Sequence, residues 1–204
     1  MAVVSNGTTI ADAGAFSVSL GSMVLLKTTT VSSNTATVSF IHGTGGVVFN
    51  NTYPIYLVKI INSHNDTDDK TLRYNFTTDG SNFNVTKTTT SFRATHYEAG
   101  GGDGEAIEIR TNADLAQSTN FQGLNLGSSD NDHAISGTLN LFNPSSTTFV
   151  KHFILNNNGC FSNDISINIF AAGYGNTTSA VDAVQFKMSS GNIDAGTITL
   201  YGIN

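Results

Sequence analysis

Hydrophobic and polar residues alternate along most of this chain. Val38 and Phe40 alternate with the polar residues Thr37 and Ser39, and Leu72, Tyr74 and Phe76 alternate with Arg73 and Asn75. A period of two is typical of a β-strand with one buried and one exposed face, and helical periodicity is nearly absent. The pattern therefore predicts strands as the main secondary structure.

The second half of the chain shows the same alternation, in residues 135–141, 165–170 and 198–203. Two other segments, residues 53–61 and 148–155, are apolar at nearly every position. Continuous apolar runs of this length are typical of strands that are covered on both faces. We therefore expect these two segments to be central strands with a layer on each side.

Short polar stretches that contain glycine separate the apolar runs and predict turns. These stretches are residues 43–46, 78–81, 100–104, 156–159 and 189–192. Residues 112–133 predict a long loop, with at most one or two helical turns within residues 113–122. Many short strands joined by polar turns indicate an all-β protein: an antiparallel two-sheet β-sandwich, jelly-roll-like, with little helix.

The length of 204 residues favours a single β-sandwich domain over residues 1–204. A chain of this size buries roughly 70% of its unfolded surface, enough for a core without disulfides. Residues 1–15 lead into the first strong strand pattern, and we interpret them as an extended N-terminal arm.

Charged residues make up only 12% of the chain, and the formal net charge is −6. Lysine and arginine occur singly along the sequence, whereas binding to nucleic acid requires clustered positive charge. We therefore expect no nucleic-acid partner. Serine, threonine, asparagine and glycine fill the polar positions instead, and such a weakly charged surface suits broad contacts with protein or sugar.

Cys160 is the only cysteine, so no intrachain disulfide and no cysteine-based zinc site is expected. The first residues lack the basic and apolar regions of a signal peptide. No apolar run approaches the ~20 residues that a membrane helix needs, so we expect no membrane insertion.

Two acidic groups are candidates for chemistry. The loop that contains Asp66, Asp68 and Asp69 offers the oxygen ligands that Ca²⁺ prefers. It lacks the glycine and the glutamate of an EF-hand loop, so we favour a solvated acidic loop. Binding of a cation by these three residues stays an open alternative. Glu98, Glu105 and Glu108 lie around the glycine-rich stretch 100–104 without the spacing of a glycosidase pair. We expect residues 65–70 and 100–104 to lie at an exposed end of the sandwich.

The histidines give no metal motif. No two of them are two or four residues apart, and His152, on one face of a predicted core strand, is interpreted as a hydrogen-bonded structural histidine. The sequence from His42 to Gly46 is interpreted as a glycine-rich turn, because the chain has no nucleophile elbow to accompany an oxyanion loop. We assign no catalytic, metal-binding or cofactor-binding residue.

Four segments resemble a family of virion structural proteins from tailed phages of marine bacteria. They are Ser5–Phe16, Tyr53–Tyr56, Leu141–His152 and the closing run Ala183–Ile203, which together extend over most of the chain. The closing run is expected to form a β-hairpin with its turn at Ser-Gly-Asn.

The resemblance implies a non-enzymatic protein of the virion surface, made in the host cytoplasm. A tail-fibre or receptor-binding protein, normally a homotrimer, is the first expectation, with other virion proteins and a host cell-surface glycan or protein as partners. A capsid decoration protein that stabilises the head shell is the alternative, and the compact size of the chain favours it. The resemblance transfers no site residue and no cofactor.

Overall fold

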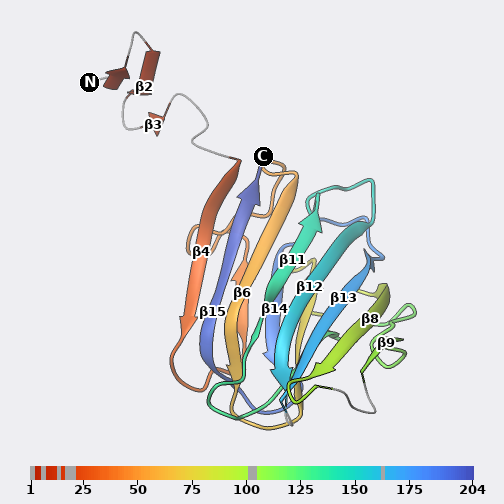
Figure 1. Ribbon diagram of the computed structural model, residues 1–204. Coiled ribbons are helices and arrows are strands. Elements are labelled where there is room, and N and C mark those ends of the chain that lie inside the picture. Colours follow the sequence, from red (N-terminus) through yellow and green to blue (C-terminus); the bar gives the residue numbers. More distant parts are fainter. Residues whose placement is uncertain (1–2, 6–7, 13–14, 17–21, 101–104, 162–163) are drawn as a thin grey trace.

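The structure is a computed structural model that describes residues 3–5, 8–12, 15–16, 22–100, 105–161 and 164–204 (Figure 1). Every helix or strand in these residues is a β-strand. The strands build a sheet of eight, a sheet of four and a separate sheet of three, and all pairings are antiparallel. The predicted all-β sandwich is therefore confirmed, with two unequal layers.

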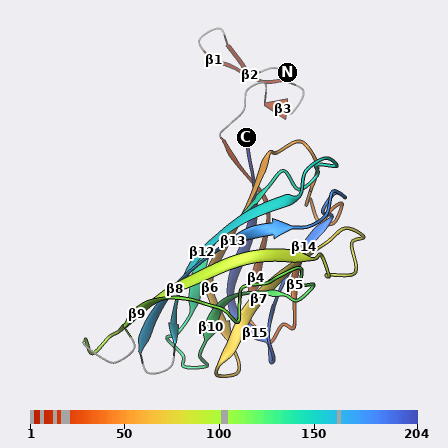
Figure 2. The ribbon, with the colours of Figure 1, turned by 90° about the vertical axis from the view of Figure 1, so that its right-hand side faces the viewer.

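The larger sheet has the order β4-β15-β6-β11-β12-β13-β8-β9, and the smaller sheet has the order β10-β7-β14-β5. Figure 1 looks onto the larger sheet, and Figure 2 views the body from its β8–β9 edge. The larger sheet contains β4 (Met23–Val31), β6 (Ile55–Asn65), β8 (Lys87–Tyr97), β9 (Ala106–Ile109), β11 (Ile135–Phe142), β12 (Lys151–Phe161), β13 (Ile165–Gly175) and β15 (Ile193–Ile203). The smaller sheet contains β5 (Val38–Ile41), β7 (Lys70–Thr77), β10 (Gln122–Gly127) and β14 (Ala183–Met188).

The hydrophobic core lies between these two sheets. Its centre is an aromatic cluster in which the ring of Tyr74 lies 5.6 Å from that of Phe153 and 6.2 Å from that of Phe186, between ring centroids. All three side chains are buried. Complete burial of a side chain of this size stabilises the fold by roughly 1.5–3 kcal/mol, so this cluster holds the two layers together.

The two segments that are apolar on both faces are central strands, as predicted, but only one of their faces is covered. In β12, Phe153 and Leu155 are buried, whereas His152, Ile154 and Asn156 are exposed. The four-stranded sheet covers the inner face, and the described residues contain no third layer on the outer face. The prediction of a layer on each side is therefore wrong.

The predicted turn at residues 156–159 is also wrong, because β12 runs straight through this asparagine-rich stretch. Asn157 is buried between the sheets, where its Nδ2 donates a long hydrogen bond of 3.5 Å to the carbonyl oxygen of Leu124. Gly137 lies opposite Asn157 in β11. A Cβ atom at position 137 would lie 2.3 Å from the Cβ of Asn157, so the glycine provides the space for this amide.

Residues 112–133 contain strand β10, so the predicted long loop is wrong in this part. They contain no helix, which agrees with the expectation of at most one or two helical turns. Leu124 and Asn125 are adjacent and both buried, because a register shift between Gly123 and Asn125 interrupts the pairing of β10 with β7. A bulge of this kind breaks the period of two. The alternation that would have indicated this strand is therefore absent from the sequence.

The closing run does not form the expected hairpin. β14 pairs with β5 and β7 in the smaller sheet, whereas β15 pairs with β4 and β6 in the larger sheet. The predicted turn at residues 189–192 is present, with Gly191 at a φ of 73°, but it leads the chain from one sheet to the other. A tight turn between alternating strands does not by itself show that the strands pair.

The N-terminal segment forms its own small antiparallel sheet from β1 (Val3–Ser5), β2 (Thr8–Asp12) and β3 (Ala15–Phe16). Both ribbon views place it beyond the end of the sandwich at which the C-terminus lies (Figures 1 and 2). The described parts of the expected extended arm are therefore short paired strands, set apart from the body. Val18 and Leu20, which alternate with Ser17 and Ser19 in the sequence and predict a further strand, lie outside the described residues.

Two buried lysines fix the loops at this end of the sandwich. The ammonium group of Lys151 donates to the carbonyl oxygens of Ser146 and Phe149, at 2.6 and 2.7 Å. That of Lys87 donates to the side-chain oxygen of Asn75 at 2.5 Å and to the carbonyl oxygen of Val85 at 2.8 Å. Burial lowers the pKa of both amines, that of Lys87 to about 7. Neither lysine is free to contact a partner.

Candidate functional site

The outward side of the eight-stranded sheet, here called the open face, is uncovered in the described residues. Eight of the ten exposed large hydrophobic side chains belong to strands of this sheet, and none belongs to the smaller sheet. They are Met23, Val24, Leu25, Ile61, Phe92, Ile107, Ile109 and Ile154. Single exposed hydrophobic residues are ordinary, but their concentration on one sheet marks a contact surface.

Aromatic and aliphatic side chains form a row at the β9 end of the open face. Phe92 and Phe170 stand opposite each other in β8 and β13, and their rings stack at 5.3 Å between centroids. Ile109 faces Phe92 from β9 and is 68% exposed. Cross-strand neighbours of this kind form one continuous apolar strip.

A shallow hollow of about 470 Å³ lies farther along the same face, lined in part by Phe142, Ile154, Ala172 and Tyr174. His152 also lines it, with its ring 6.0 Å from that of Tyr174. This histidine is exposed and packs beside an aromatic ring, so it lies on the open face and not in the core. The hollow interrupts an otherwise flat sheet surface.

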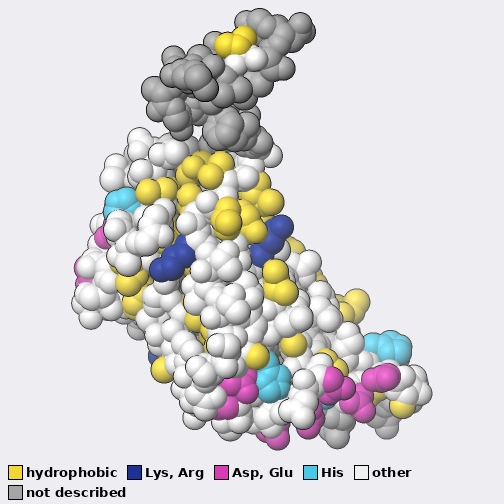
Figure 3. Space-filling model, turned by 90° about the vertical axis from the view of Figure 1, so that its left-hand side faces the viewer, with side chains coloured by type: hydrophobic (Ala, Val, Ile, Leu, Met, Phe, Trp, Pro, Cys, Tyr) yellow, Lys and Arg dark blue, Asp and Glu magenta, His cyan; other side chains and the backbone are white. Residues whose placement is uncertain are grey.

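Strand β4 forms one edge of the larger sheet, and its outer side has no strand partner in the described residues. Met23 and Leu25 on this edge are 45% and 57% exposed. Figure 3 shows hydrophobic atoms gathered on this side of the molecule, near the end from which the N-terminal segment continues. A long apolar edge strand is a template for pairing with another chain.

The acidic loop after β6 is bonded to two neighbouring loops. The Asp66 carboxylate accepts hydrogen bonds from the backbone and side-chain nitrogens of Asn192 at 2.9 and 2.8 Å. Asp68 accepts from the backbone N–H and the hydroxyl of Ser129 at 2.7 and 2.9 Å. These hydrogen bonds hold the pKa of both carboxyls below its ordinary value, and the bonds from the backbone N–H groups have the largest effect. Asp69 is exposed.

The three carboxylates thus do not converge on one point as cation ligands would. Among the residues that the structure describes, no group of three or more His, Cys, Asp or Glu side chains is arranged to hold a metal ion. Residues 68 and 69 are exposed, and so are residues 98–100 before the glycine stretch. Residues 101–104, the rest of that stretch, lie outside the described part of the chain.

His64 lies at the same end of the sandwich, between two hydrogen-bond acceptors. Its Nδ1 is 2.6 Å from the carboxylate of Asp194, and its Nε2 is 3.0 Å from the carbonyl oxygen of Asp130. Both ring nitrogens can donate only when the ring is the imidazolium cation. Burial acts against this charge, but the bonds to Asp194 and Asp130 outweigh it and raise the pKa of His64.

Glutamate and histidine side chains singled out in the sequence form contacts within the fold. Glu108 pairs with Arg93, and Glu105 lies 3.2 Å from His96, both at the β8–β9 edge. The predicted turn at residues 43–46 is confirmed, and the Nδ1 of His42 beside it accepts the backbone N–H of Phe49 at 2.9 Å.

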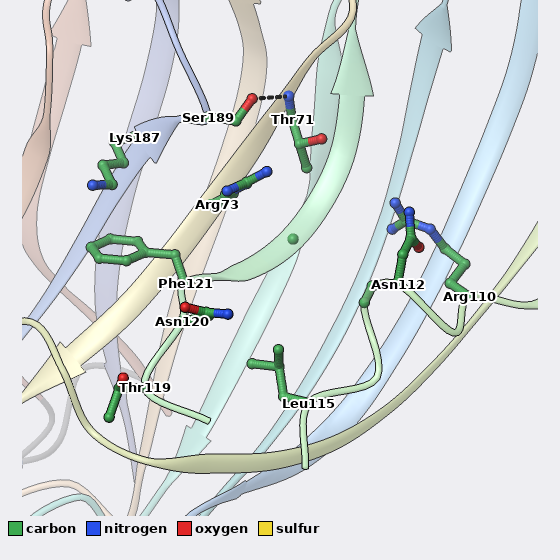
Figure 4. Close-up of a pocket in the computed structure, with 12 residues that line it drawn as sticks. Thr71, Arg73, Arg110, Asn112, Leu115, Thr119, Asn120, Phe121, Lys187 and Ser189 are labelled. Atoms are coloured by element: carbon green, nitrogen blue, oxygen red, sulfur yellow. Dashed lines mark hydrogen bonds between the residues drawn. The ribbon is translucent and has the colours of Figure 1, made fainter. Parts of the chain in front are cut away.

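A cavity of about 460 Å³ lies on the opposite side of the molecule, between the smaller sheet and the segment 110–121 that crosses it (Figure 4). We call it the basic cavity, because Arg73, Arg110 and Lys187 line it. The ammonium group of Lys187 lies 4.1 Å from the centroid of the Phe121 ring. Sequence reasoning missed this group, because its members are scattered along the chain and only the pairing of β7 with β14 and β10 brings them together.

The chain matches no protein-family model, no curated protein and no solved structure. Among the described residues, no helix has the length and apolar character needed to cross a membrane. Function therefore has to be argued from the open face and the basic cavity themselves.

Proposed function

We propose that this chain is a non-enzymatic structural protein of the virion surface of a tailed phage, of the tail-fibre or receptor-binding type. The open face is the observation that carries the proposal. Contact with another surface would remove its apolar side chains from water, which is energetically favourable. The resemblance of four sequence segments to virion structural proteins supports the same assignment.

A second copy of this chain is the occupant that the open face fits. Copies with a formal charge of −6 repel each other unless they meet through a surface that lacks acidic groups. Six of the eight strands of the larger sheet contain no aspartate or glutamate, namely β4, β6, β8, β11, β12 and β13. The acidic residues of the other two strands each have a basic partner, Arg93 for Glu108 of β9 and His64 for Asp194 of β15. Association through this face, in a homotrimer, therefore covers the apolar strip without bringing unpaired carboxylates together.

The state of assembly in solution tests this step. Size-exclusion chromatography with light scattering is expected to show an oligomer for the wild-type chain and a monomer for Ile154→Asp. Thr44→Asp, in an exposed turn outside the open face, is the matched control and should stay oligomeric. A wild-type monomer at the highest soluble concentration, or an unchanged oligomer in Ile154→Asp, would refute the assignment of the open face.

A capsid decoration protein is the second candidate, and the detached N-terminal sheet favours it. A sheet of three short strands has too little apolar surface to be stable alone, and β1 to β3 lie apart from the sandwich. A neighbouring subunit on a shell would supply the missing contact. The copy number on the particle separates the two candidates, since decoration requires on the order of hundreds of copies and a tail appendage far fewer.

A further inference from the structure

The basic cavity concentrates positive charge that the fold does not need. Arg73 of β7 and Lys187 of β14 are direct partners in an antiparallel pair, and Figure 4 shows both side chains at the cavity. Like charges in this position repel each other and destabilise a sheet. No aspartate or glutamate is among the residues that line the cavity. The pair therefore favours an anionic ligand that would offset the repulsion.

Arg110 adds a third cation from a buried position. Its side chain is only 8% exposed, and burial, together with the nearby charge of Arg93, lowers the pKa of its guanidinium. Its hydrogen bond to the carbonyl oxygen of Leu124 is long, at 3.5 Å. Among the described residues no carboxylate lies within ion-pair distance of it. The charges of Asp114 and Glu108 raise the pKa of this guanidinium and partly offset the effect of burial, but neither carboxylate forms an ion pair with Arg110. A ligand carboxylate would supply the planar, hydrogen-bonded partner that the guanidinium fits.

The floor of the cavity is open because of one glycine. Strand β7 lies between β14 and β10, and Arg73 of β7 pairs with Lys187 of β14 on one side and with Gly123 of β10 on the other. These three residues therefore form a row across the smaller sheet. A Cβ at position 123 would lie 3.2 Å from the side chain of Thr71. The missing side chain leaves space beside the guanidinium of Arg73 for a ligand group.

The remaining lining favours a sugar over a nucleotide. Five of the twelve lining residues carry hydroxyl or amide side chains, among them Thr119, Asn112 and Asn120, and these groups match the hydroxyls of a saccharide. The ammonium group of Lys187 already occupies one face of the Phe121 ring, so this face is not available to stack a base. The volume of about 460 Å³ lies within the range of small-ligand sites.

We propose that the basic cavity binds an acidic oligosaccharide, with Arg73, Arg110 and Lys187 positioned along it to bind its carboxylates and the amide side chains to bind its hydroxyls. The interpretation of this site as the contact with a host surface rests on the proposed function as a virion protein. The binding itself is a property of the isolated chain. It is therefore tested separately from the location of the protein on a particle.

Isothermal titration calorimetry with three probes tests the proposal. The probes are a galacturonic acid trimer, the same trimer with its carboxylates reduced to alcohols, and inorganic sulfate. We expect the acidic trimer to bind, with an affinity that falls as salt concentration rises, and the reduced trimer and sulfate to bind at least about tenfold more weakly. A tenfold loss is the size of effect that one charge-assisted contact provides.

Variants assign the binding to this cavity. Arg73→Gln and Lys187→Gln, both at incompletely buried positions, are expected to weaken binding of the acidic trimer at least about tenfold. Lys59→Gln removes the same charge from the opposite sheet, where Lys59 lies 5.2 Å from the centroid of the Tyr201 ring, and should change binding less than about twofold. Circular dichroism of each variant checks that the fold is intact.

Several results would overturn the site. These are absence of binding of the acidic trimer, equal binding of its reduced form, sulfate binding as tight as that of the trimer, or an equal effect of Arg73→Gln and Lys59→Gln. None of them affects the open face, whose assembly is measured without any ligand. Conversely, a chain that binds the trimer but is absent from virions would retain the site and lose the proposed function.

Discussion

Substitution of Lys87 by methionine is expected to change how the stability of this protein depends on pH. Lys87 is fully buried, and burial lowers the pKa of its amine from 10.5 to about 7. In the unfolded chain the amine regains its ordinary pKa. Between pH 7 and pH 10.5 the unfolded state therefore binds more protons than the folded state, and the stability of the wild type rises with pH.

The magnitude follows from this difference in pKa. Each pH unit contributes at most about 1.4 kcal/mol to the free energy of unfolding, so the Lys87 contribution grows by as much as about 4 kcal/mol from about pH 7 to about pH 10. A methionine side chain at this position cannot carry the charge. The Lys87→Met variant loses the two hydrogen bonds of the amine and also its titration, so its free energy of unfolding should lack this rise with pH. The stability of the variant relative to the wild type should therefore fall steadily as the pH rises.

Urea unfolding at several pH values between about 7 and about 10 measures the effect. Leu155→Ala is the matched control, because it truncates a fully buried side chain without removing a titratable group. It should lower the free energy of unfolding by about 2–5 kcal/mol, by the same amount at every pH. If the difference between Lys87→Met and wild type is equally constant across this range, the buried amine does not titrate there.

Three further predictions concern the loops and the larger sheet. The pKa of His64 is raised in the folded protein, so protonation of His64 stabilises the fold below about pH 6.5, and this stabilisation is lost as the pH rises through the raised pKa. The melting temperature of the wild type should therefore fall over this pH range, and that of His64→Gln should not show this fall. Gly137→Ala places a methyl group against Asn157, and urea unfolding should show a loss of about 1–3 kcal/mol or more. Asp66→Ala removes the acceptor for the Asn192 backbone N–H, so this amide should exchange with deuterium faster than in the wild type. An unchanged exchange rate would show that the carboxylate does not hold the turn at residues 189–192.

The alternation of hydrophobic and polar residues was sufficient to predict the sandwich. It predicted the strands around Val38 and Tyr74 because their apolar residues alternate with polar ones and face the core, although Asn75 and Thr77 are buried as well. It was insufficient where a strand buries polar groups. Asn157 belongs to a strand because its amide reaches a carbonyl across the core and Gly137 makes room for it, and neither condition can be read from neighbouring residues.

Long-range pairing explains the other differences. The partners of β14 and β15 lie in different sheets, so the turn between these two strands connects the smaller sheet to the larger one and does not connect two paired strands. The same limit hid the basic cavity. Arg73 and Lys187 are far apart in the sequence and look like isolated surface charges, and only the register of β7 against β14 makes them neighbours. The sequence contained the residues of the site but no signal of their proximity.

Electron cryo-microscopy of phage virions assembled in the presence of this chain tests most directly our proposal that it is a virion protein whose open face is an assembly surface. We expect density for the sandwich on the outside of the particle, with the strip around Phe92 and Ile154 buried against another copy. Particles that lack the chain, or that display it with the larger sheet facing solvent, would contradict this assignment.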